Sequence, residues 1–329
     1  MTATVKTCYP RRLCFVVPTC LLPAVAHAQT AYPVKPVHVV VPFPSGGPTD
    51  VVVRILTPRL SEALGQQILV DNRGGAGGTT GTELVAKSLP DGYTVLAGTI
   101  GGLAVSTSLN AKLGYNTLRD LAPIMQLVNV SYIVTLHPSV PAKTLRELLT
   151  LTKSLPGKMH YGSSGAGTGP HLAGELMNLM GGMKIVHVPY KGSAPAQTAL
   201  LSGEVDLNFE NTLLVLPHLK SGRLRAIAAT GATRSKLLPK LPTVAEVALP
   251  GFSASGWYGI MAPAAVHKDI IGKLNTEVTR ALRTPEIADR LNRLAAEPAP
   301  GTPDQFATFI RSEIDKWARV VKAAKMKVD

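Results

Sequence analysis

The sequence predicts an α/β fold made of two halves of similar size. The chain has 329 residues, a length that corresponds to about two domains. Hydrophobic residues make up 45% of it and charged residues 17%, below the roughly 25% of an average soluble protein. Apolar runs of strand length alternate with amphipathic stretches of helix length, and this alternation occurs twice along the chain. Each half can therefore bury a core of its own.

Residues 1–28 are predicted to be a signal peptide. Arg11 and Arg12 belong to a positive region, residues 13–26 are largely apolar, and an A-x-A cleavage site ends at Ala28. Cleavage near Ala28 predicts a periplasmic protein, and the arginine pair leaves twin-arginine export open beside the general secretory route. All three cysteines lie in this segment, so we expect no disulfide, cysteine nucleophile or zinc–thiolate site in the exported part. No later apolar run is long enough for a membrane anchor.

Five alternating elements predict a sheet in the first half. The expected strands and helices are a strand at 37–41, a helix at 51–64, a strand at 67–71, a helix at 82–89 and a strand at 94–98. A β-α-β-α-β order favours a parallel sheet with helices on both faces.

The second half repeats the alternation of strands and helices. We expect strands at 132–136, 159–162, 184–188, 205–209 and 224–229, and helices at 143–154, 171–180 and 194–201. A strand at 257–262 and two amphipathic helices at 269–282 and 304–321 close the chain. Thr302 and Gln305 predict a capping box at the start of the last helix, whose apolar stripe is expected to pack in the core.

Three glycine-rich loops follow predicted strands and precede predicted helices, at residues 42–50, 71–81 and 162–171. Glycines let the backbone approach a ligand, and the helix starts behind the loops offer free N–H groups to an anion. Ligands of α/β folds bind beyond the carboxyl ends of the strands, so the loops are predicted to hold a small anion. The alternative for the first loop is a tight turn in which Thr49 or Asp50 caps the helix.

Other chemistries find little support in the sequence. The loops match neither a dinucleotide-binding nor a P-loop pattern. The third loop lacks the G-x-S-x-G spacing of a serine hydrolase, so His171 is expected to hydrogen bond its own loop. The histidines are dispersed, and we predict no metal, no cofactor and no catalytic residue. The formal charge of +13 is scattered along the chain and aromatic residues make up only 5%, so no nucleic-acid partner is expected.

These loops, together with residues 188–195, resemble the Bug family of periplasmic solute receptors. Members of that family are the substrate-binding (TctC-like) subunits of tripartite tricarboxylate transporters. The resemblance extends over residues 32–329, and its motifs occur in the family's order at 42–50, 72–81, 161–175, 187–195 and 240–251. It implies a type II periplasmic binding-protein fold, with two α/β lobes around a central ligand cleft. Lobe one would comprise residues 31–131 and 253–329, and lobe two residues 132–252.

The resemblance also implies a receptor rather than an enzyme. Such a receptor captures a small carboxylate (a dicarboxylate, tricarboxylate, amino acid or aromatic acid) and delivers it to membrane permease subunits, and we expect it to act as a monomer. In the family, backbone amides and hydroxyls of the first lobe hold one carboxylate, and the second lobe contacts the far end of the ligand. Carried over by position, lobe one would supply Ser45, Gly46, Gly47, Thr49, Gly77, Gly78 and Thr79, and lobe two Ser163, Ser164, Gly167, Thr168, Tyr190, Glu210 and Asn211.

Two positions depart from the family's pattern. Residues 99–103 are less polar than the corresponding stretch often is, which disfavours a citrate-like ligand. The family tends to carry aspartate where Glu210 stands, so either the far end of the pocket is tighter here or Glu210 is a solvated loop carboxylate.

Three other functions are alternatives to this one. A ligand-sensing receptor for a membrane sensor kinase would use the same pocket and would differ only in its partner. An exported serine hydrolase would use Ser163 or Ser164 with His171, but no acid is marked to complete its site. An effector domain of a DNA-binding regulator is disfavoured by the signal peptide and by the lack of a helix-turn-helix segment.

Overall fold

The computed structural model describes residues 1–8 and 32–326. The chain divides into two units, with the boundary between Ala31 and Tyr32, and the second unit is described here by itself. The predicted cleavage site at Ala28 lies outside the described residues. Within the described ranges, none of the helices combines the length and the apolar character that a membrane crossing requires.

The first three strands form a parallel sheet, as predicted. β1 (Val37–Val41) lies between β2 (Ile68–Asn72) and β3 (Thr94–Thr99) and runs parallel to both. The sheet then continues with β9 (Ser255–Pro263), which is antiparallel to β3. The complete sheet is therefore mixed, because a strand from late in the chain extends the parallel part.

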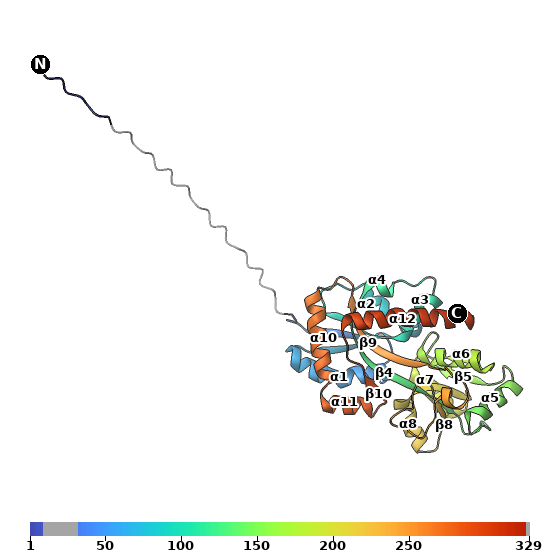
Figure 1. Ribbon diagram of the computed structural model, residues 1–329. Coiled ribbons are helices and arrows are strands. Elements are labelled where there is room, and N and C mark those ends of the chain that lie inside the picture. The colour runs from blue at the N-terminus through green and yellow to red at the C-terminus, as the bar shows by residue number, and fades with distance from the viewer. Residues whose placement is uncertain (9–31, 327–329) are drawn as a thin grey trace. The chain divides into compact units, whose positions relative to one another are not determined.

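Helices cover both sides of these strands, which confirms the second part of the prediction. Figure 1 shows α2, α3 and α12 on one side and α1 and α11 on the other. The elements of this part are α1 (Pro48–Leu64), η1 (Ala76–Gly78), α2 (Thr79–Ala86), η2 (Gly101–Val105, a π-helical turn), α3 (Ser106–Leu109), α4 (Thr117–Asp120), α10 (Lys268–Leu282), α11 (Pro285–Asn292), β10 (Ala296–Pro298) and α12 (Pro303–Ala323).

The long strand β4 (Leu121–Leu136) takes part in two sheets. Its first part pairs with β9 and β10, whereas residues 132–136 pair with β7 (Leu207–Asn211) and β8 (Arg225–Ala229). Thr230 joins the same region to the returning chain, since its N–H donates to Tyr132 O at 2.9 Å and its hydroxyl donates to Ala254 O at 2.7 Å. Only the second part of β4 was predicted.

The second sheet also has a parallel core. β5 (His160–Ser163) runs parallel to β6 (Val186–Pro189) and to β7, and β7 is antiparallel to β4. The helices of this part are α5 (Leu145–Ser154), α6 (Gly169–Gly181), α7 (Ser193–Ser202), α8 (Thr212–Lys220) and α9 (Val244–Val247). The predicted helices 143–154, 171–180 and 194–201 correspond to α5, α6 and α7, whereas α8 was not predicted.

The last helix begins and packs as predicted. Thr302 and Gln305 form both hydrogen bonds of the capping box. The apolar stripe of α12 enters the main core, where Glu313 Oε2 accepts hydrogen bonds from the indole N–H groups of Trp257 (2.9 Å) and Trp317 (3.0 Å). This helix therefore fixes β9, a strand that also borders the cleft described below.

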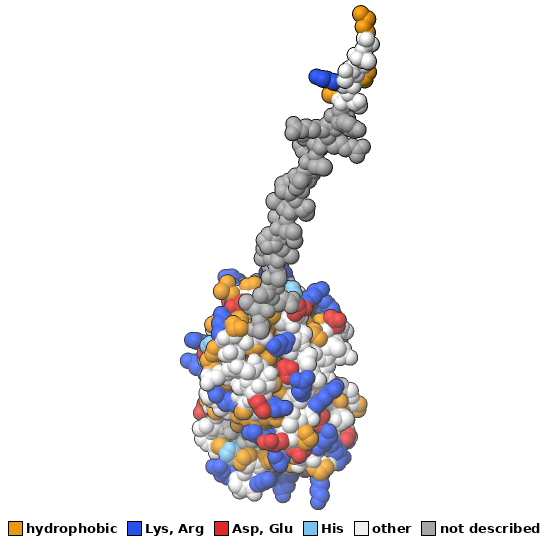
Figure 2. All heavy atoms as spheres, turned by 90° about the vertical axis from the view of Figure 1, so that its left-hand side faces the viewer, with side chains coloured by type: hydrophobic (Ala, Val, Ile, Leu, Met, Phe, Trp, Pro, Cys, Tyr) orange, Lys and Arg blue, Asp and Glu red, His pale blue; other side chains and the backbone are white. Residues whose placement is uncertain are grey.

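Charged side chains are mixed on the face shown in Figure 2. Lys and Arg side chains are scattered over that face, with Asp and Glu side chains between them. On this face the positive charge forms no continuous patch of the kind that binds a phosphate backbone.

Candidate functional site

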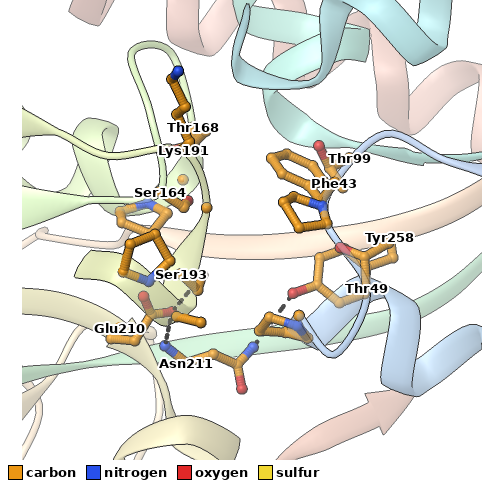
Figure 3. Close-up of a pocket in the computed structure, with 18 of the residues that line it drawn as sticks. Phe43, Thr49, Thr99, Ser164, Thr168, Lys191, Ser193, Glu210, Asn211 and Tyr258 are labelled. Carbon is orange, nitrogen blue, oxygen red and sulfur yellow. Dashed lines mark hydrogen bonds between the residues drawn. The ribbon is translucent and has the colours of Figure 1, made fainter. Parts of the chain in front are cut away.

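A cavity with about 630 Å³ of empty volume lies between the two sheets. Figure 3 shows Phe43, Thr49, Thr99 and Tyr258 on one side of it, facing Ser164, Ser193, Glu210 and Asn211 on the other. Phe43 and several prolines, together with Ile100, give it apolar walls. The charged side chains among its described lining residues are Lys191 and Glu210, and no arginine is present among them.

Three helices begin at the wall of this cavity. The first residues of α1, α6 and α7 (47–49, 168–170 and 192–195) line it. None of the three N-termini carries a side-chain cap, so their first N–H groups are not satisfied by the helix's own cap residue. Free N–H groups and the positive ends of the helix dipoles favour an anion at this place.

Hydroxyl groups from distant strands complete the wall. The Tyr258 hydroxyl on β9 accepts a hydrogen bond from Asn211 Nδ2 at 3.4 Å and also interacts with the Thr49 side chain. Asn211 Oδ1 caps α8 by accepting from the N–H of Leu213 at 3.1 Å. Tyr132, from β4, lines the same cavity. Burial raises the pKa of both tyrosines above 10, so both hydroxyls are protonated and can donate.

Asp50 holds the first loop in place. Its Oδ2 accepts from the Gly46 N–H and from Arg54 Nε, both at 2.9 Å, and its Oδ1 accepts from Asn72 Nδ2 at 3.0 Å. Burial opposes ionisation of Asp50, but these hydrogen bonds prevail and lower its pKa. The Gly46 N–H is therefore already bonded to Asp50, and this hydrogen bond stabilises the conformation of the loop.

Glu210 is buried at the carboxyl end of β7, and 2% of its surface is exposed. The alternative of a solvated loop carboxylate is therefore wrong. Its Oε1 accepts from the Asn211 N–H at 2.7 Å and from Ser193 Oγ at 3.3 Å. Burial raises the pKa of Glu210 to about 7, although these two hydrogen bonds act in the opposite direction.

A second, larger cavity of about 1720 Å³ of empty volume adjoins the first, and the two share Phe43, Pro44, Ser164, Lys191 and Gly192. The loop 74–79 lines it from one side and residues 164–167 from the other. The two loops approach each other closely, since a Cβ atom on Gly77 would lie 2.3 Å from Ala166 O. Gly77 has a φ of +66°, which also favours glycine.

The predicted site residues divide between the two cavities. Ser45, Gly47, Thr49, Ser164, Thr168, Glu210 and Asn211 line the first, and Gly77, Gly78, Thr79, Ser164, Gly167 and Tyr190 line the second. Gly46 and Ser163 line neither of them. The Tyr190 hydroxyl donates to Glu204 Oε1 at 2.7 Å, within its own part of the chain. Sequence reasoning did not assign Phe43, Tyr132, Lys191, Ser193 and Tyr258 to the site, although the stretches 42–50 and 187–195 that it singled out contain Phe43, Lys191 and Ser193.

The serine–histidine pair considered for a hydrolase, Ser163 or Ser164 with His171, is not formed. His171 accepts the Gly167 N–H on its Nδ1 at 2.9 Å, which confirms that it bonds its own loop. Ser163 is buried and lies 2.6 Å from Nε2 of a different histidine, His187. Ser164 is at the cavity wall, but His171 is committed elsewhere.

A two-lobed binding protein is the class that this fold and this cleft define. The sequence profile of the tripartite tricarboxylate transporter family receptor matches residues 52–326. Protein BugT of Bordetella pertussis is 40% identical over 299 residues, which cover 90% of this chain and 92% of that protein. The chain therefore belongs to the tripartite tricarboxylate transporter receptor family, which includes the Bug proteins.

Solved structures of similar proteins have the same fold. R. palustris Rpa4515 with adipate has a TM-score of 0.87 at 35% identity, covering 90% of this chain and 99% of that chain. The periplasmic binding protein BugD has a TM-score of 0.85 at 34% identity, with the same coverage. MatC from Rhodopseudomonas palustris with bound malate has a TM-score of 0.83 at 33% identity, covering 88% of this chain and all of that chain. The expected two-lobe periplasmic binding-protein fold is thus confirmed.

Proposed function

We propose that this receptor captures a small carboxylate in the first cavity and delivers it to the permease of a tripartite transporter from the periplasm. The observation that carries the proposal is the convergence of three uncapped helix N-termini, those of α1, α6 and α7, on one cavity. Helix N-termini stabilise an anion through fixed N–H groups, without a salt bridge. The relatives solved with adipate and malate are consistent with such a ligand.

The proposal includes the lobe boundaries and the site residues. Lobe one is residues 31–131 and 253–329, and lobe two is residues 132–252. The change of pairing partner within β4 at residues 131 and 132 supports this division. We assign ligand contact to the predicted residues that line the first cavity and contact between the lobes to Gly77, because its loop meets the backbone of Ala166.

A thermal-shift screen tests the proposal. The purified protein is heated with succinate, malate, citrate, aspartate, glutamate, benzoate, nicotinate and terephthalate. A ligand at 100 times its dissociation constant adds about 2.7 kcal/mol to the free energy of unfolding, so one or more acids should raise the melting temperature by a few degrees.

A matched pair of variants locates the binding. Ser164→Asp places a negative charge in the cavity and should abolish the shift, because like charges repel strongly where water is excluded. Ser154→Asp makes the same change at the exposed last residue of α5 and should retain the shift. A folded protein that no acid of the panel stabilises, or equal shifts in both variants, would count against a carboxylate in this cavity.

A further inference from the structure

Glu210 places a negative group in a cavity whose helix ends favour anions. One carboxylate oxygen, Oε1, is held by Asn211 and Ser193. Within residues 32–326, no hydrogen bond or ion pair reaches the other oxygen, Oε2. Figure 3 shows the Glu210 carboxyl group at the end of the cavity, beside Ser193 and Asn211. In a side chain that is otherwise buried, a carboxylate oxygen with an unfilled bonding position at a cavity wall is a place for a donor from the ligand.

The groups around Glu210 leave its charge without a cation. Ser193 faces it from α7, Asn211 from the start of α8, and the hydroxyls of Tyr132 on β4 and Tyr258 on β9 are close enough for the Glu210 charge to raise their pKa further. All four groups are neutral. Lys191 also lines the cavity, but its side chain extends toward the opposite end (Figure 3).

The helix starts and Glu210 offer different chemistry to a ligand in the same cavity. The N-termini of α1 and α6 offer free N–H groups to one carboxylate. At α7, by contrast, the Ser193 hydroxyl in the first turn donates to Glu210, so a carboxylate of the protein itself already lies beside this helix start. Proline side chains, Phe43 and Ile100 also line the cavity and give it apolar walls. A ligand that reaches from these N–H groups to Glu210 therefore meets donors at the first contact and a carboxylate acceptor at the second.

We propose that Glu210 determines specificity by accepting a hydrogen bond from an N–H or O–H donor at the second end of the ligand and by disfavouring a second carboxylate. The inference rests on the proposed function, and it narrows the substrate class to acids with one carboxylate and a distal donor, for which an ω-amino acid is the clearest probe. An ammonium group supplies the charge that Glu210 lacks, whereas a second carboxylate places like charges together in a buried site.

The proposal has a consequence for pH. Because the Glu210 carboxyl titrates near pH 7 in the empty cavity, a dicarboxylate can bind after Glu210 takes up a proton and becomes a donor. The affinity for a dicarboxylate should then fall as the pH rises above 7, since the protonated form becomes scarce. The affinity for an ω-amino acid should rise or stay constant over the same range, as long as its amine remains charged.

Isothermal titration calorimetry with two probes of five carbons tests the inference. 5-Aminopentanoate and glutarate differ only at the second end. At pH 8.5 the wild-type protein should bind 5-aminopentanoate at least about tenfold tighter than glutarate. On lowering the pH to 6, the glutarate affinity should rise by on the order of tenfold or more, because most Glu210 carboxyls are then protonated.

Two variants separate specificity from general effects of a buried carboxyl group. Glu210→Gln keeps an acceptor for Ser193 and Asn211 but removes the charge, so the preference for 5-aminopentanoate and the pH dependence should both disappear. Glu175→Gln is the matched control, since Glu175 is a partly buried carboxyl with a pKa raised by burial that lines neither cavity. It should behave as the wild type.

The outcomes distinguish this inference from the proposed function. Equal or tighter binding of glutarate by the wild type at pH 8.5 would overturn it, and so would an unchanged ratio in Glu210→Gln. If that variant does not fold, the wild-type pH series decides alone. Binding of an acid from the screening panel without any binding of 5-aminopentanoate would also overturn the inference while the proposed function stands. If no acid binds at all, the proposed function fails first.

Discussion

His171 should make the protein sensitive to mild acid. Its ring is buried, with 5% of the residue exposed, and stacks on His187 with ring centroids 3.8 Å apart. Burial, and to a lesser degree His187, lower the pKa of His171 to about 3. Its Nδ1 accepts the Gly167 N–H. A proton on Nδ1 would convert this acceptor into a donor, and two donors would then face each other. Protonation should therefore loosen the loop that lines both cavities.

The sign and size of the effect follow from proton linkage. A histidine in the unfolded chain has a pKa of about 6.5 and takes up its proton first as the pH falls, so the folded state loses stability between pH 6.5 and about 3. At pH 5 protonation of His171 in the unfolded chain shifts the folding equilibrium about 30-fold toward the unfolded state, while the buried histidine of the folded state remains neutral. This corresponds to a loss of about 2 kcal/mol relative to pH 7.5.

Urea denaturation at pH 7.5 and pH 5 measures the effect as a difference between proteins. Glu210 acts in the opposite direction, since a raised pKa makes its folded form take up protons first as the pH falls. The wild-type change is therefore compared with that of His171→Asn, which keeps an acceptor for Gly167 and removes the titration. The wild type should lose about 2 kcal/mol more than the variant between the two pH values.

The control variant for this test replaces an exposed histidine. His38→Asn changes a histidine on the exposed face of β1, and its difference from the wild type should be well below that of His171→Asn. A difference below about 0.5 kcal/mol for His171→Asn, or one of opposite sign, would show that burial does not keep His171 neutral.

Two further predictions concern the core and the contact between the loops. Glu313→Leu leaves two buried indole N–H groups without an acceptor and should lower the free energy of unfolding by about 2–4 kcal/mol in urea denaturation, whereas a loss below about 1 kcal/mol would show that the carboxylate is not needed. Gly101→Ala places a Cβ 2.9 Å from Gly77 O and 3.0 Å from Gly167 O, and should weaken carboxylate affinity by on the order of tenfold in calorimetry through poorer closure. Gly272→Ala, on α10 with no atom within 4 Å of the new Cβ, should leave affinity unchanged, and equal losses in both variants would contradict the closure contact.

The sequence was most informative where structure is local. The β-branched run 37–41 is β1 as predicted, and the capping box of Thr302 defined the start of the last helix. By contrast, the first part of β4 was missed because Pro123 and the polar residues in it hide a strand that is specified by pairing with β9, far away in the chain. The π-helical turn at 101–105 has no side-chain periodicity that a sequence pattern can detect.

The same distinction explains which parts of the site could be predicted. Glycine-rich loops and helix starts are local signals, and the loops that they indicate supply Ser45 and Thr49 to the wall of the first cavity. The character of the far end depends on long-range pairing: β7 lies against β4, which buries Glu210 and brings Tyr132 into the same wall. Burial is what raises the pKa of Glu210, so the feature proposed to choose the ligand arises only when the two strands pair. Receptors with near-identical loops can therefore differ in specificity through a few residues on strands, where no loop motif records the difference.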